Sequence, residues 1–181
     1  LMLRDMVVLL LLVIGVMGLV LTYLFRRLVA VLAPIIVVSL AVLWTLGSMA
    51  YLGLAVGLIS SMLPAFIFVV GVGDSVHLLS VYRTERLSGT DNREAIVRAV
   101  ARTGQPVLLT TMTTAIGLFS FEMASVTAIQ ELGRAGGIGV IMAMLSTMTI
   151  LPVCLLWFAR GSSPHQPKVK SDSIDRFLSM C

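Results

Sequence analysis

The stretch of sequence that decides the fold is residues 54–81, LAVGLISSMLPAFIFVVGVGDSVHLLSV. It contains a single charged side chain, that of Asp74. An α-helix needs about 20 mostly apolar residues to cross the hydrocarbon core of a bilayer. The stretch therefore predicts a transmembrane helix that carries one acidic group inside the membrane.

The composition of the whole chain agrees with this prediction. Hydrophobic residues make up 58% of the 181 residues and charged residues 12%, against roughly 45–50% and about 25% in soluble domains. A soluble protein of this size needs more polar surface than this sequence supplies. The net charge of +4 is therefore not taken as a sign of nucleic-acid binding, and no nucleic-acid partner is expected.

Working outward from this stretch, the sequence predicts an all-α membrane protein, a bundle of five transmembrane helices. The expected spans are residues 6–25, 28–46, 54–81, 106–121 and 135–158. A short cytoplasmic amphipathic helix is expected at 93–103, because Asp91 to Glu94 resemble a capping box and Gly104 and Pro106 follow. Residues 160–181 are polar and indicate a cytoplasmic linker. The chain begins with Leu1, so we expect it to be part of a longer protein.

The positions of the positive charges predict the orientation. With five spans, eleven of the thirteen Lys and Arg residues fall on one side of the membrane, and only Arg4 and Arg134 fall on the other. Loops rich in Lys and Arg stay in the cytoplasm. We therefore expect the first residue outside and the last inside, in a cell membrane such as the bacterial inner membrane.

Asp74 is the main candidate for chemistry. An acid at the centre of a membrane helix costs about 2.5–3.5 kcal/mol on insertion scales, so such residues face a protein interior and often serve a function. His77 follows three residues later on the same helix face. The pair is a candidate proton relay, with His77 the weaker member. The alternative is that Asp74 bonds one helix to another.

Four threonines, Thr110, Thr111, Thr113 and Thr114, begin the expected fourth span. They either pack against a neighbouring helix or form a polar lining beside Asp74. Gly71, Gly73, Gly133 and Gly137 are interpreted as helix-packing positions. The sequence contains no nucleophile–base pattern, metal-ligand cluster or cofactor loop, so neither an enzyme nor a cofactor or metal is expected.

The stretch Gly-Val-Gly-Asp-Ser-Val-His-Leu-Leu-Ser-Val-Tyr-Arg, residues 71–83, resembles the fourth-helix motif of the resistance–nodulation–division (RND) superfamily. The resemblance is to its MMPL-type, Patched-like and hopanoid-exporter-like branches. It continues through Glu94-Ala95-Ile96, Gly104, the threonines at 110–114, Gly117–Ser120, Glu131–Gly133 and Leu151-Pro152. The same five-helix unit is similar to the sterol-sensing domain.

The resemblance implies that the chain holds helices two to six of one half of a transporter. A second half and a large extracytoplasmic domain would then belong to the same full-length protein. In this family, acids of the fourth helix relay protons, and Asp74 takes that position. Many relatives carry two adjacent acids or an Asp-Tyr pair here, whereas Gly73 precedes Asp74 in this chain, so the proton stoichiometry stays open.

The resulting hypothesis is a membrane domain of a proton-motive-force-driven exporter of hydrophobic or lipid-like substrates, in contact with membrane lipids. The alternative is a sterol- or lipid-sensing regulatory module that does not transport. The substrate, the identity of the half and the oligomeric state, with a homo-oligomer among the options, are left open by the sequence.

Overall fold

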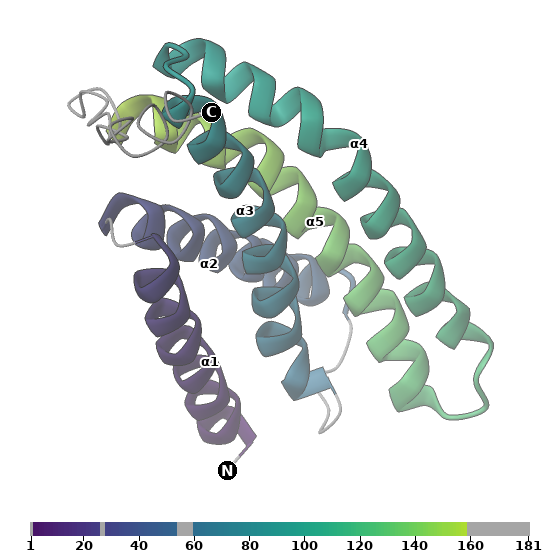
Figure 1. Ribbon diagram of the computed structural model, residues 1–181. Helices are drawn as coiled ribbons and strands as arrows, with labels where there is room; N and C mark the ends of the chain where they lie inside the picture. The colour runs from purple at the N-terminus through teal and green to yellow at the C-terminus, as the bar shows by residue number, and fades with distance from the viewer. Residues whose placement is uncertain (1, 26–27, 54–59, 159–181) are drawn as a thin grey trace, which may run out of the picture.

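The computed structural model describes residues 2–25, 28–53 and 60–158 (Figure 1). Within these ranges every regular element is helical: α1 (Met2–Phe25), α2 (Leu28–Tyr51), α3 (Leu63–Leu87), α4 (Asn92–Phe119), α5 (Thr127–Phe158), and two 3-10 turns, η1 (Ser60–Met62) and η2 (Ser120–Met123). The predicted all-α class is confirmed. The predicted linker at 160–181 lies outside the described residues.

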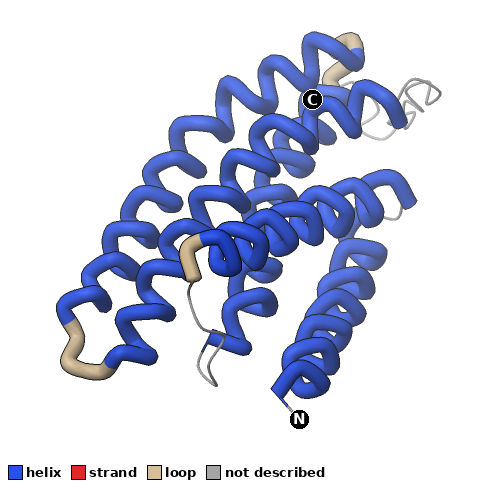
Figure 2. Tube along the Cα trace, turned by 180° about the vertical axis from the view of Figure 1, so that it is seen from behind, coloured by secondary structure: helices blue, strands red, loops and turns tan. Residues whose placement is uncertain are grey.

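α3 and α5 lie at the centre of the bundle: α5 packs against α2, α3 and α4, and α3 packs against α1, α2, α4 and α5. α1 packs against α2 and α3 and lies on the opposite side of the bundle from α4, as both views show (Figures 1 and 2). Phe68, Ile67, Val38 and Val140 are buried between the helices. α2, α3 and α5 therefore bury apolar side chains against one another.

The outer faces of the helices are apolar. Leu19, Leu43 and Ile116 are 72%, 63% and 68% exposed, an arrangement that suits hydrocarbon rather than water. Among the described residues, four helices are long and apolar enough to cross a membrane: Ala30–Tyr51, Leu63–Leu87, Asn92–Met123 and Thr127–Trp157. The apolar part of α1, Val7–Tyr23, is shorter.

α2 and α3 end later than the sequence predicts. α2 continues past residue 46 to Tyr51, and α3 continues past residue 81 to Leu87. Both helices are followed by a glycine with positive φ, Gly53 at 67° and Gly89 at 85°. Glycine adopts this left-handed backbone without the strain that a Cβ brings. These glycines, and not the ends of the apolar runs, set where the helices stop.

Residues 93–103 are helical but form the first turns of α4 rather than a separate helix. Asp91 is the N-cap, as predicted, and its carboxylate accepts a hydrogen bond from the Arg93 N–H. The helix then runs through Gly104 and Pro106 without a break. A proline inside a helix removes one backbone hydrogen bond, but the buried residues Thr103 and Val107 on either side keep both parts of α4 packed.

α5 begins at Thr127, eight residues before the predicted start at 135. The polar residues of its first turns are held against η2 and the residue that follows it. Gln130 Nε2 donates to the Ala124 carbonyl at 2.8 Å, and Arg134 pairs with Glu122 at 2.5 Å. Tertiary contacts therefore extend this helix beyond the apolar segment.

Candidate functional site

Asp74 lies near the middle of α3 and is half-buried. Its Oδ2 atom is buried and forms no hydrogen bond with the described residues. A buried carboxylate oxygen without a partner is costly in an apolar surrounding. Asp74 is therefore a group that either gains a partner from outside these residues or is neutralised by a proton.

His77 lies one turn further along α3 and is exposed. It interacts electrostatically with Asp74. Gly73 and Ser80 are exposed as well, and the three residues lie at the helical spacing that places them on one side of α3. A membrane-spanning helix thus has an uncovered stripe, Gly73, His77 and Ser80, directly beside its acid, and two of these three residues have polar side chains.

α3 and α5 are in register through two close approaches. The Ile67 side chain fills the space beside Gly139, and a Cβ on Gly71 would lie 3.5 Å from the Ala143 Cβ. Four residues separate the two contacts on each helix, so the helices run in the same direction. One turn further along, the register brings Ser146 and Thr147 of α5 to the level of Asp74.

Ser146 and Thr147 are 1% and 0% exposed, and neither hydroxyl oxygen has a hydrogen-bond partner among the described residues. The sequence analysis missed both residues. Their signal was weak, because one Ser-Thr pair inside an apolar helix is also what ordinary helix packing looks like.

The four threonines of α4 have different surroundings. Thr111 is buried, Thr114 is half-buried, and Thr110 and Thr113 are exposed. The hydroxyls of Thr110, Thr113 and Thr114 donate to backbone carbonyls of their own helix. A lining role for these threonines beside Asp74 stays a prediction.

The four glycines singled out in the sequence also differ. A Cβ on Gly133 would lie 2.5 Å from the Leu118 carbonyl oxygen, and one on Gly137 would lie 2.7 Å from the Phe119 ring. A Cβ on Gly71 would lie 3.0 Å from Val38, whereas one on Gly73 would meet open space.

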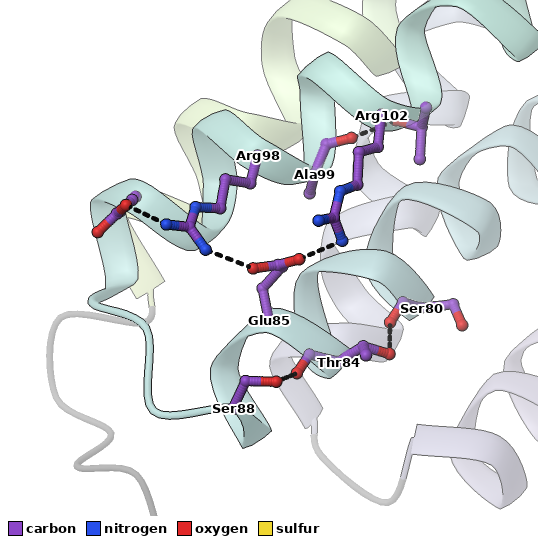
Figure 3. A network of polar contacts seen from close by, with 9 residues as sticks. Ser80, Thr84, Glu85, Ser88, Arg98, Ala99 and Arg102 are labelled. Atoms are coloured by element: carbon purple, nitrogen blue, oxygen red, sulfur yellow. Dashed lines mark hydrogen bonds and ion pairs between the residues drawn. The ribbon is translucent and has the colours of Figure 1, made fainter.

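A second polar cluster joins α3 to α4 at the end of the bundle that holds residues 83–102, here called the arginine end (Figure 3). Glu85 is buried, with its side chain 7% exposed, and it accepts hydrogen bonds from Arg98, at 3.3 Å, and from Arg102. Arg98 also pairs with Glu94 at 2.6 Å. Glu85 was not singled out in the sequence, because the expected span ended at residue 81, before this side chain.

In the described part of the chain, no group of three or more His, Cys, Asp or Glu side chains is placed to hold a metal ion. The acidic group near the middle of the membrane-spanning helix α3 is the carboxyl group of Asp74.

Comparison with known proteins identifies the family. Residues 1–177 match the sequence model of the MMPL family. The chain belongs to the MMPL family. This membership agrees with the resemblance found in residues 71–83 and with the helical bundle that holds Asp74.

Three relatives illustrate the range of the MMPL-family match. A putative membrane protein, MJ1562, of Methanocaldococcus jannaschii is 29% identical over 88% of this chain and 41% of its own length. The hopanoid transporter HpnN of Burkholderia multivorans is 35% identical over 65% of this chain and 14% of its own length. The heme uptake protein MmpL11 of Mycobacterium tuberculosis is 26% identical over 83% of this chain and 16% of its own length. The chain thus spans less than half the length of each of these relatives.

Proposed function

We propose that this chain is part of the membrane domain of a proton-motive-force-driven exporter of hydrophobic or lipid-like molecules. The observation that carries the proposal is the unpaired, buried Oδ2 atom of Asp74 on a membrane-spanning helix of an MMPL-family chain. A carboxyl group in this position is stable when protonated and costly when ionised and unpaired. Uptake and release of a proton therefore change the free energy of the helix packing around it.

The proposed relay consists of Asp74 as the proton-carrying group and His77 as a secondary group that passes the proton on. His77 lies on the uncovered stripe with Gly73 and Ser80, so it would contact the part of the full-length protein that packs on that side of α3. We assign that part to the second half of the membrane domain. No catalytic residue and no cofactor is part of the proposal.

The names of two relatives support the proposed substrate class. One is named a hopanoid transporter and another a heme uptake protein, and both names refer to large, mostly apolar molecules. The second name refers to uptake, the direction opposite to the export proposed here. Substrate selection is assigned to an extracytoplasmic domain of the full-length protein.

The orientation is part of the proposal. The arginine end carries five arginines, Arg83, Arg86, Arg93, Arg98 and Arg102, whereas Arg134 lies near the α4–α5 turn at the other end of these helices. This bias supports a cytoplasmic arginine end. The protein is accordingly assigned to the cell membrane, with the first residue of this chain outside and the last one inside.

The test uses the full-length protein reconstituted in liposomes with an imposed pH gradient. Nile red serves as the hydrophobic probe, and a pH-sensitive dye reports the movement of protons. Asp74→Asn should abolish both probe efflux and coupled proton movement while the amount of inserted protein stays unchanged. The control is Asp91→Asn, the same chemical change at an exposed N-cap, where Asn also caps well. Coupled transport by Asp74→Asn at the rate of the unchanged protein would remove Asp74 from the mechanism.

A further inference from the structure

Three buried side-chain oxygens in the described residues have no hydrogen-bond partner: Asp74 Oδ2, Ser146 Oγ and Thr147 Oγ1. Three other buried hydroxyls of the bundle behave differently. Thr45, Ser75 and Thr103 each donate to the carbonyl four residues earlier, at 2.8 Å. This local bond is what Ser and Thr inside helices normally form, so Ser146 and Thr147 depart from the usual pattern.

The three unpaired oxygens lie at one level of the bundle. The contacts of Ile67 with Gly139 and of Gly71 with Ala143 fix the register of α3 and α5. Asp74 follows Gly71 by three residues, and Ser146 and Thr147 follow Ala143 by three and four. Positions three and four residues further along a helix return to the same face. Ser146 and Thr147, about 100° apart around α5, therefore flank the line of contact with α3 at the level of the Asp74 carboxylate.

From this arrangement we infer that Asp74, Ser146 and Thr147 form an internal water-binding site between α3 and α5, and that the bound water carries protons to and from Asp74. A buried water typically makes about three hydrogen bonds to otherwise unsatisfied polar groups, and the site offers three such atoms. A hydroxyl both donates and accepts, so either one can orient a water toward the carboxylate.

The proton-transfer step rests on the proposed function of Asp74. The O–H bond of the protonated carboxyl group breaks as a new O–H bond forms on the water oxygen, and that water passes one of its other protons to the next water. Asp74 is left as a carboxylate. Ser146 and Thr147 stay neutral throughout, so they are positioning residues.

The test is infrared difference spectroscopy of the purified full-length protein between high and low pH. Asp74→Asn identifies the C=O band of the protonated Asp74, and the band that shifts in H2(18)O identifies the internal water. The double variant Ser146→Ala/Thr147→Val should lose the water band and shift the Asp74 band to higher frequency, because a carboxyl group without a hydrogen-bond partner absorbs there.

Two further variants serve as controls. Thr149→Val removes a hydroxyl of α5 that already donates to the Leu145 carbonyl at 2.6 Å, so both bands should stay unchanged. Thr147→Ser retains the hydroxyl and should also retain both bands, and the single variants Ser146→Ala and Thr147→Val replace the double variant if it does not fold.

Unchanged bands in the variants without hydroxyls would overturn the water site. A different result is that the variants without hydroxyls lose the water band while the unchanged protein shows no C=O band of protonated Asp74 at any pH. It would uphold the binding of water and overturn the proton transfer, and with it the proposed function.

Discussion

In the ion-pair cluster at the arginine end, removing the carboxylate of Glu85 and removing the guanidinium groups of Arg98 and Arg102 should destabilise the α3–α4 contact to different extents. The side chain of Glu85 is 7% exposed, whereas those of Arg98 and Arg102 are 48% and 64% exposed. Glu85→Ala leaves two arginines that water can hydrate. Arg98→Ala/Arg102→Ala leaves a buried carboxylate that nothing in the cluster can neutralise. The second change should therefore destabilise the α3–α4 contact more than the first.

The magnitudes follow from the exposure of each partner. Hydrogen bonds to charged groups contribute about 1.5–3 kcal/mol each, but half-exposed arginines recover much of this energy from water. We expect Glu85→Ala to cost about 1–2 kcal/mol, a factor of about 5–30 in the local opening equilibrium. A buried charge that loses its partners costs about 3–5 kcal/mol, so the double arginine variant should open more than about a hundredfold more often.

Hydrogen exchange of the backbone amides in residues 92–103, followed by mass spectrometry on the full-length protein in detergent, measures this local opening. The control is Glu94→Ala, which removes only the exposed partner of Arg98 and should change exchange by about twofold, or roughly 0.5 kcal/mol. Equal effects of Glu85→Ala and the double arginine variant, or a larger effect of Glu85→Ala, would refute the reasoning from burial.

Three further outcomes can be checked in the same full-length protein. Gly133→Ala should lower the free energy of unfolding by about 1–3 kcal/mol, because its Cβ would lie 2.5 Å from the backbone oxygen of Leu118, and titration with denaturing detergent measures this loss. Gly104→Ala, where a Cβ meets open space within α4, should instead stabilise by roughly 0.5–1 kcal/mol in the same titration. In a variant without native cysteines, Thr90→Cys should react with an impermeant maleimide only after cell lysis and Ala124→Cys in intact cells; the reverse pattern would contradict the proposed orientation.

The sequence predicts both the fold class and the importance of Asp74, and for the same reason. A lone charge in a long apolar run is conspicuous, and the cost of burying it points to a protein-lined surrounding. The helix ends were less predictable from the apolar runs, because glycines stop α2 and α3 and tertiary contacts carry α3 and α5 beyond those runs. α3 continues through the polar residues after 81 since Glu85 finds its partners on α4, and no local pattern shows that pairing.

Ser146 and Thr147 illustrate a different limit. Their residue types are ordinary in membrane helices, and their position opposite Asp74 depends on how α5 is rotated and shifted against α3. That register follows from two close approaches, at Gly71 and Gly139. The glycines are visible in the sequence, but the partners that they receive are set only when the helices pack. A layer of polar residues from two helices therefore cannot be predicted when each helix is considered separately.

The two polar sites of α3 can be separated by experiment, and their separation decides how the loss of transport in Asp74→Asn is interpreted. Asp74 and Glu85 are eleven residues apart on one helix, about 16 Å at 1.5 Å per residue, and they share no hydrogen-bond partner among the described residues. Changes at such a distance normally act independently. Asp74→Asn should therefore leave the exchange of residues 92–103 unchanged. If it accelerated that exchange, the substitution would be loosening the α3–α4 contact, and the loss of transport would then reflect damaged packing instead of a missing proton carrier.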